Sequence, residues 1–325
     1  MKKPDFDRFL LQSTFLPEEE KRSYTGNFSY SASRYSLFRF CKRAWFFHYI
    51  AAQGGWNEYT KDFCQEIYTQ KYLVSFPAFL SNILTSSIRE SLPLIREEEK
   101  EDKRLSILRD AIRFRASAII FHAHHFLRNG GMDTDPRHLA FFDLYYRTGK
   151  FENGEELIEN CKDILRNFLP QFFQSSFFRV LALLPAPAWR YGENFPSFIL
   201  DGLTIFLPPS LYALSGGCLY RFAVSFFEEY KESFSSSSDA LFALYTESKY
   251  PGHKGKKVFL HYSEKENILT EEVTYPTAEE KELIFSRAEE MVKYLQDPQI
   301  SFFPCTEEKE NYLFCRFRKN CKNPE

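Results

Sequence analysis

The chain has 325 residues, of which 44% are hydrophobic and 26% are charged, so it is long enough for one large domain or two smaller ones. No stretch approaches the ~18 consecutive apolar residues that a membrane span requires, and the N-terminus turns polar at once, without a signal-peptide apolar region. We therefore expect a cytoplasmic protein with no membrane partner. The net charge of -2 leaves nucleic-acid binding open, because a neutral protein can carry a local basic groove.

Aromatic residues make up 18% of the chain, with 36 Phe and 19 Tyr. A Phe-rich core is the simplest interpretation, and a stacking platform for single-stranded nucleic acid is the alternative. The seven cysteines are scattered along the chain, which is not the pattern of a disulfide framework.

The first half of the chain is predicted to be mainly helical. Residues 1–26 are polar, and we expect them to be partly disordered; residues 27–184 then form the helical region. Leu37, Phe40, Ala44 and Phe47 follow a Ser-rich start at helical spacing, which predicts a helix. Further helices are expected over 60–92, with an interruption near Pro77, over about 105–126, and over about 157–168.

Strand patterns begin after Pro185, so residues 185–325 are predicted to form a sheet-containing core that ends in a helix and a cysteine-containing tail. We expect residues 27–325 to fold as one compact unit. The run of serines over 235–238 is interpreted as a loop, and Thr277 with Glu280 has the pattern of a capping box that opens the last helix. The expected strands cover 188–193, 197–201, 211–214, 218–226, 257–262 and 268–274, with a helix over 240–247.

The hairpin over 209–225, Pro-Ser-Leu-Tyr-Ala-Leu-Ser-Gly-Gly-Cys-Leu-Tyr-Arg-Phe-Ala-Val-Ser, resembles that of the PD-(D/E)XK nuclease superfamily. Members of that family typically carry Pro-Asp on one strand. On the next strand they carry an acidic residue, one spacer residue and a Lys. Here Ser210 stands at the first acid, Ala223 at the second and Ser225 at the Lys. Thr85 falls where a helix of this family's RecB-like branch carries a His.

Three other segments are similar to the RecB-like and CRISPR-adaptation exonuclease branch of the family. Residues 33–49 resemble its entry motif, 139–146 resemble a helical aromatic motif, and 315–321 resemble its closing cysteine motif. The resemblance implies an α/β fold with a restriction-endonuclease-like mixed β-sheet core, flanked by helices and preceded by a large N-terminal helical region.

Nucleases of this kind use carboxylates on adjacent strands to hold Mg²⁺ or Mn²⁺, which activates a water for attack on the phosphodiester. An alanine and two serines supply no anionic oxygens, so we predict that no intact catalytic set remains and that no cofactor is bound. The alternative is an active nuclease that binds Mg²⁺ or Mn²⁺ through relocated acids, with Glu193 and Asp201 as candidates. The simpler interpretation of this pair is a strand-end Glu and a turn Asp before Gly202.

The resemblance also implies a metal site, since relatives often hold an iron–sulfur cluster with one entry-motif cysteine and three from the tail. This chain offers Cys41, Cys315 and Cys321, while Tyr312 occupies the fourth position and Cys305 lies seven residues before it. We expect free thiols packed where the ends of the chain meet; an iron–sulfur or Zn²⁺ site is the alternative. His122 and His125 share a helix face at i, i+3 spacing, which is interpreted as a polar face.

Basic residues accompany the cysteines at both ends. If the family resemblance brings Cys41 close to Cys315, two basic clusters become one patch that could bind a phosphate backbone; scattered solvated charge is the alternative. The candidates for nucleic-acid binding are Arg34, Arg39, Lys42, Arg43, Arg316, Arg318 and Lys319.

Together these observations predict a catalytically inactive nuclease-like protein that binds DNA or a protein partner in repair, recombination or defence. Two alternatives remain: an active metal-dependent DNA nuclease with relocated acids, and a structural scaffold without nucleic-acid contact.

Overall fold

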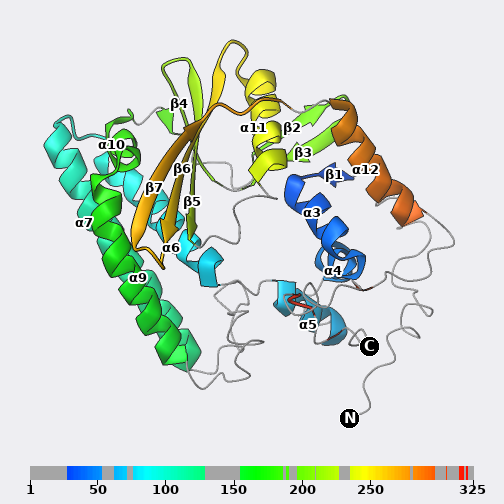
Figure 1. The fold of residues 1–325 in the computed structure, drawn as a ribbon, viewed down its shortest axis with the longest axis horizontal. Coiled ribbons are helices and arrows are strands. Elements are labelled where there is room, and N and C mark those ends of the chain that lie inside the picture. Colours follow the sequence, from blue (N-terminus) through cyan, green and yellow to red (C-terminus); the bar gives the residue numbers. More distant parts are fainter. Residues whose placement is uncertain are drawn as a thin grey trace. The chain divides into compact units, whose positions relative to one another are not determined.

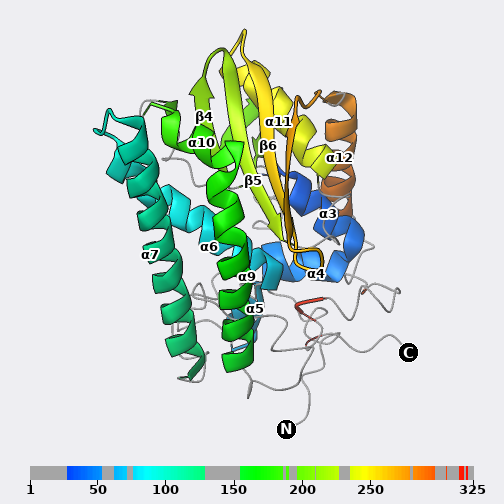
Figure 2. The same ribbon diagram turned by 60° about the vertical axis from the view of Figure 1, so that its left-hand side comes forward.

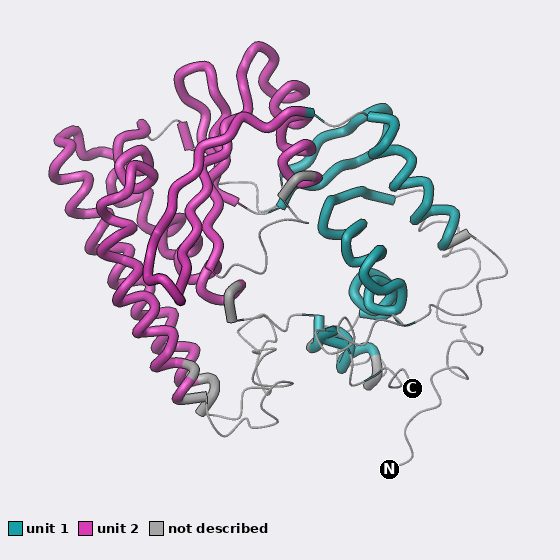
Figure 3. The backbone as a smooth tube through the Cα atoms, in the orientation of Figure 1, with its two compact units in different colours: residues 1–71, 195–208, 278–325 teal, residues 72–194, 209–277 magenta. Residues whose placement is uncertain are grey.

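The computed structural model describes residues 28–52, 62–71, 76–128, 154–185, 188–189, 196–208, 210–226, 235–278, 281–296, 305, 315–317 and 320. The chain forms two compact units, and each is assembled from separate stretches of sequence (Figure 3). Unit 1 comprises residues 1–71, 195–208 and 278–325, and unit 2 comprises 72–194 and 209–277. Both units cross the predicted boundary between residues 184 and 185. Among the described residues, no helix is long and apolar enough to cross a membrane.

Unit 1 combines a small mixed sheet with short helices. Strand β3 lies at the centre of this sheet, parallel to β1 and antiparallel to β2. The elements are β1 (Ser29–Tyr30), α3 (Ala32–Phe40), α4 (Lys42–Phe46), the π-helix η1 (Phe47–Ala51), α5 (Asp62–Lys71), β2 (Ser197–Leu200), β3 (Leu203–Phe206) and α12 (Lys281–Gln296).

The predicted N-terminal helix is divided at Cys41. Its start is as expected, because the Ser31 hydroxyl accepts a hydrogen bond from the Arg34 amide as an N-cap. Cys41 has an extended backbone, with φ -163° and ψ 114°, which ends α3. Its Sγ then accepts from the Ala44 amide at 3.4 Å and caps α4. The thiol replaces the hydroxyl of an ordinary cap, which the helical spacing of apolar residues did not indicate.

Unit 2 is built on a four-stranded mixed sheet in the order β4-β5-β6-β7 (Figure 1). The β4–β5 and β6–β7 pairs are antiparallel hairpins, and β5 pairs with β6 in parallel, with α11 as the connection between them. The strands are β4 (Leu211–Ser215), β5 (Cys218–Phe226), β6 (Lys254–Ser263) and β7 (Ile268–Thr274). Gly216 and Gly217 form the predicted β4–β5 turn with φ of 54° and 72°, values that favour glycine at both positions.

Helices cover both faces of this sheet. The helix α11 (Ser235–Lys249) packs against β6 on one face, where Phe242 lies 6.0 Å from Tyr212 between ring centroids. On the other face, α6 packs against β5 and α9 against β7, while α7 packs along both helices (Figure 2). These helices and their short neighbours are α6 (Phe76–Ser91), η2 (Leu92–Ile95), α7 (Glu101–Arg128), α9 (Gly154–Gln174) and α10 (Ser176–Leu183).

Aromatic side chains fill the core of unit 2, as the high Phe content predicts. Phe168 of α9 lies 4.9 Å from Phe226 and 5.5 Å from Tyr262 between ring centroids, and so connects the helix layer to β5 and β6. Phe177 meets Phe222 edge-on at 5.0 Å. All five side chains are buried, which places much of the phenylalanine content in the core.

The structure corrects several sequence predictions. The serine run over 235–238 is the first turn of α11 and not a loop, since serines are also favoured at helix starts. The strands β1 and β3 were not predicted; each is at most four residues long and carries little periodic signal. At the expected strand 188–193, Trp189 makes an isolated bridge to Ala213, and residues 190–193 lie outside the described part, as does the predicted motif over 139–146.

Candidate functional site

The hairpin positions expected to carry chemistry share one face of the unit 2 sheet. The register pairs Leu211 with Phe222, so continuing it by one residue sets Ser210 opposite Ala223. Ser225 lies two residues further along β5 and therefore on the same face. The Ser210 hydroxyl donates to the Phe222 carbonyl at 2.6 Å, which ties it to the hairpin. We call this the hairpin face.

Thr85 does not join these three residues. It lies on α6, whose buried residues belong to the core that contains Phe222 and Phe226. Side chains alternate along β5, so that core lies on the side of the sheet opposite Ala223. The structure thus brings together three of the four expected positions.

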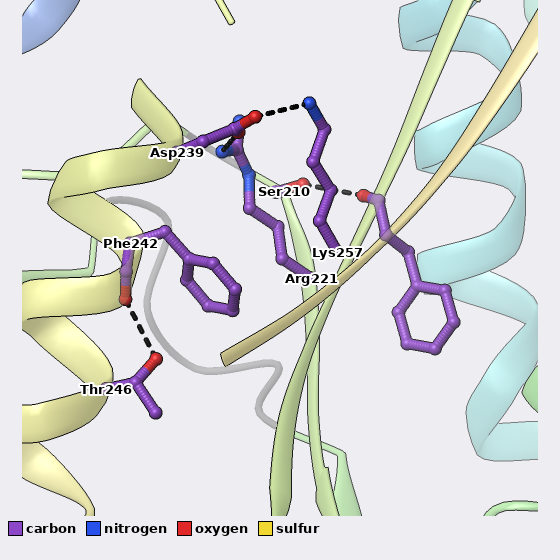
Figure 4. A network of polar contacts seen from close by, with 7 residues as sticks. Ser210, Arg221, Asp239, Phe242, Thr246 and Lys257 are labelled. Atoms are coloured by element: carbon purple, nitrogen blue, oxygen red, sulfur yellow. Dashed lines mark hydrogen bonds and ion pairs between the residues drawn. The ribbon is translucent and has the colours of Figure 1, made fainter. Parts of the chain in front are cut away.

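A compact charged network occupies the hairpin face beside these positions (Figure 4). Asp239 of α11 accepts from Arg221 at 3.0 Å through one carboxylate oxygen and from Lys257 at 2.6 Å through the other. The three side chains are only 10–19% exposed. Arg221 and Lys257 are paired residues of the parallel strands β5 and β6. Each carboxylate oxygen of Asp239 thus binds one cation of the neighbouring strands.

Of the two candidate substitute acids, the structure describes one. Asp201 occupies the turn between β2 and β3 in unit 1, exposed and with φ 45°, as the turn interpretation predicts. Glu193 lies outside the described residues. Among the described residues, no group of three or more His, Cys, Asp or Glu side chains is arranged to hold a metal ion.

The cysteines from the two ends of the chain meet in unit 1. Cys41 and Cys315 are buried in one apolar cluster, with Cys305 packed against it, which confirms that these segments are neighbours. Burial raises the pKa of the Cys315 thiol to about 12, with smaller upward contributions from the other two cysteines. Without a bound metal, the Cys315 thiol therefore stays protonated near neutral pH. Cys321 lies outside the described residues.

Four basic groups gather beside this apolar cluster, and we call them the basic cluster: Arg34 of α3, His48 of η1, Lys71 of α5, and Arg316. Burial, followed by the charges of Arg316, Lys71 and Arg34, lowers the pKa of His48 to about 3. Burial and then Arg34 likewise lower the pKa of Lys71. The charged neighbours named in these shifts therefore lie within electrostatic range of His48 and Lys71.

Hydrogen bonds and ring contacts fix the basic cluster. Arg316 donates to the Lys71 carbonyl at 2.7 Å, which satisfies a backbone acceptor at the end of α5. Arg34 donates to the Ser29 hydroxyl at 2.8 Å and lies 4.3 Å above the centre of the Tyr49 ring. The His48 and Tyr49 rings are 4.5 Å apart between centroids. The guanidinium and imidazole groups are therefore held in place by the surrounding fold and not spread freely over the surface.

The other basic candidates lie apart from this arrangement or outside the described residues. Arg39 pairs with Glu290 at 3.9 Å on an exposed surface. Lys42 lies 4.8 Å above the Phe38 ring, and Arg43 is buried. Arg318 and Lys319 are not among the described residues. Of the seven candidates, Arg34 and Arg316 belong to the basic cluster.

Sequence reasoning missed His48 and Lys71. His48 was covered only as part of the segment over 33–49, although it lies in a π-helix, a distortion that is frequent at functional sites. Lys71 is the last residue of α5, and nothing in its neighbourhood in the sequence marks it. Only the packing of unit 1 brings these residues beside Arg34 and Arg316.

Comparison of the chain with models of known protein families, with curated proteins and with solved structures finds no match in any of the three.

The lowered pKa of His48 predicts an acid-dependent loss of stability. The unfolded chain binds a proton at His48 below about pH 6.5, whereas the folded protein binds it only near pH 3. Folding stability should therefore fall as the pH decreases from 6.5, with a slope of up to about 1.4 kcal/mol per pH unit from this residue. Urea unfolding of the His48→Gln variant between pH 4.5 and 7.5 should show a shallower pH dependence than the wild type. Parallel profiles for the two proteins would contradict the assignment.

Proposed function

We propose that this protein is a non-cutting relative of the PD-(D/E)XK nucleases that acts by binding DNA, and that the basic cluster of unit 1 contacts the phosphate backbone. One observation carries the proposal: Arg34 and His48 of the segment over 33–49, Lys71 of α5 and Arg316 meet in one place. The guanidinium and ammonium groups of this cluster attract the negative charge of a phosphate.

The chemistry of the basic cluster suits a phosphodiester. A guanidinium presents a planar fork of donors that matches phosphate oxygens, and the cluster holds two of them. The guanidinium of Arg34 lies 4.3 Å from the centre of the Tyr49 ring. This contact already restricts the Arg34 side chain, so phosphate binding would remove less of its conformational freedom. His48 stays neutral over the physiological range and offers a hydrogen bond without adding further repulsion.

Two features of unit 2 support the absence of cutting. Ser210, Ala223 and Ser225 share the hairpin face but supply neither the paired carboxylates that a divalent cation requires nor an amine. The carboxylate of Asp239, on the same face, has an oxygen bound to each of two cations. The mixed sheet with helices on both faces is in keeping with a restriction-endonuclease-like core.

Binding should depend on salt and on the basic cluster. Fluorescence anisotropy with labelled single-stranded and duplex DNA in Mg²⁺ should give affinities that fall linearly with salt on a logarithmic scale. We expect Lys71→Gln and Arg316→Gln each to weaken binding about three- to tenfold and to reduce the salt slope by about 1. Lys293→Gln, on exposed α12 of the same unit, is the matched control and should bind like the wild type.

The same complexes separate the alternatives. Incubation in Mg²⁺ or Mn²⁺ should leave the DNA intact; cleavage that EDTA abolishes would establish an active nuclease instead. A folded protein that shows no salt-dependent binding to either DNA would favour the structural-scaffold alternative. Equal losses of DNA affinity in the Lys71→Gln and Lys293→Gln variants would show that the basic cluster is not the DNA-binding site.

Restoring acids tests the nuclease-like geometry of the hairpin face. Side chains on directly opposite strand residues have Cβ atoms about 5 Å apart, close enough for two carboxylates to share one cation. The Ser210→Asp, Ala223→Asp double variant should therefore bind Mn²⁺ in calorimetric titrations more than tenfold tighter than either single variant, while the wild type shows no saturable binding. A double variant no better than the singles would mean that these two positions do not converge.

A further inference from the structure

A row of three side chains crosses the unit 2 sheet on the face opposite the hairpin face. Lys256 of β6 is paired with Tyr220 of β5 in the parallel ladder. Tyr275 directly follows β7, and continuing the β6–β7 register by one residue sets it opposite Lys256. The Lys256 ammonium lies 5.1 Å from the centre of the Tyr220 ring and 5.8 Å from that of the Tyr275 ring. We call these three residues the tyrosine row.

The tyrosine row begins at the margin of the aromatic core and ends in solvent. The Tyr220 ring lies 5.9 Å from the Phe222 ring between centroids, with only 12° between the ring planes, and Phe222 is buried. Tyr275, at the other end of the row, is 58% exposed. Packing within unit 2 therefore explains the position of Tyr220 but leaves most of the Tyr275 side chain in water. Exposed aromatic rings held on a rigid sheet offer flat surfaces on which bases stack.

Lys256 differs from its neighbour Lys257 in how its charge is balanced. Lys257 points to the hairpin face and binds the Asp239 carboxylate at 2.6 Å. Among the described residues, no carboxylate pairs with Lys256, whose ammonium lies between the two rings. The acid on the same face of β7, Glu271, forms hydrogen bonds with the start of α10. Lys254 lies on the same face two residues before Lys256 and is exposed. This end of the sheet therefore presents positive charge that can bind an anion.

We propose that the tyrosine row is a binding site for single-stranded nucleic acid, with one base stacked on each tyrosine ring and a phosphate between them held by Lys256. A strand laid across β5, β6 and β7 meets a ring, an ammonium and a ring, in the order in which it presents base, phosphate and base (Figure 1). Ring stacking accepts any base, and the ammonium supplies the counter-charge of the backbone. An apolar protein surface would leave the Lys256 charge unmatched, and the bases of a duplex are already stacked on one another.

Comparing a base-containing strand with a base-free strand separates stacking from charge. Labelled oligothymidylate and an abasic strand of the same length carry the same phosphates, so the basic cluster of unit 1 contributes to both in fluorescence anisotropy. We expect the wild type to bind oligothymidylate at least about fivefold more tightly than the abasic strand. Tyr275→Ala should lose this preference and Tyr275→Phe should retain it. A wild type without the preference, or a Tyr275→Ala protein that keeps it, would overturn the proposal.

Two matched variants in unit 2 control for the loss of a ring and of a charge. Phe114→Ala removes a ring that is 76% exposed on α7 and should leave the base preference unchanged. Lys256→Gln should weaken single-strand binding and reduce its salt slope by about 0.7, whereas Lys265→Gln, exposed in the β6–β7 turn, should not. Because the Tyr275 side chain is exposed, circular dichroism of Tyr275→Ala should match the wild type. Equal losses in Tyr275→Ala and Phe114→Ala would contradict the assignment to the tyrosine row.

The tyrosine row does not depend on the function proposed for unit 1, and the two sites are distinguishable in the same titrations. Lys71→Gln should weaken the binding of duplex and single strand alike, whereas Tyr275→Ala should weaken the binding of the single strand only. Single-strand affinity that falls in Lys71→Gln but not in Tyr275→Ala would overturn the tyrosine row and leave the basic cluster supported. The reverse result would support the tyrosine row and count against DNA binding by the basic cluster.

Discussion

The apolar contact between the entry segment and the C-terminal residues holds the basic cluster together. Phe317 meets Phe47 at 5.5 Å between ring centroids, and Cys315 and Cys41 are buried in the same cluster. Burying a side chain of this size contributes about 1.5–3 kcal/mol, so a few such contacts offset the cost of bringing cations together. Without this packing, Arg316 would not be held beside Lys71, and the residues of the basic cluster would not come together.

The charged side chains of the two units are arranged differently. On the hairpin face of unit 2, Arg221 and Lys257 are held by Asp239 within the fold, so the network joins α11 to β5 and β6. In unit 1, burial and then the charges of Arg316, Lys71 and Arg34 lower the pKa of His48. The proposed DNA binding concerns the basic cluster of unit 1, and the proposed loss of catalysis concerns the hairpin face of unit 2.

Sequence reasoning succeeded where the signal is local. The strand over Cys218–Phe226 was predicted with its observed bounds, and the paired glycines before it set the turn and the register. The long helix α7 was likewise evident from its apolar spacing. The register then follows from the turn and, continued by one residue, sets Ser210 opposite Ala223, whereas the sequence matched these two residues only to motif positions of the family they resemble.

The rest depends on contacts between distant residues. Arg316 and Lys71 are 245 positions apart, and no periodicity in either segment reports their meeting. The break at Cys41 escaped prediction because a thiol caps α4 where a hydroxyl would have been recognised. Unit 1 is itself assembled from three stretches of the chain, so composition along the sequence does not reveal its limits.

DNA binding by the basic cluster is tested by hydrogen exchange of the protein with and without a short DNA duplex in Mg²⁺ buffer. We predict slower exchange in the bound state across residues 42–52 and 62–71, which contribute His48 and Lys71 to the basic cluster, and intact DNA at the end of the experiment. Protection confined to the strands of unit 2, with exchange in unit 1 unchanged, would show that DNA does not bind at the basic cluster.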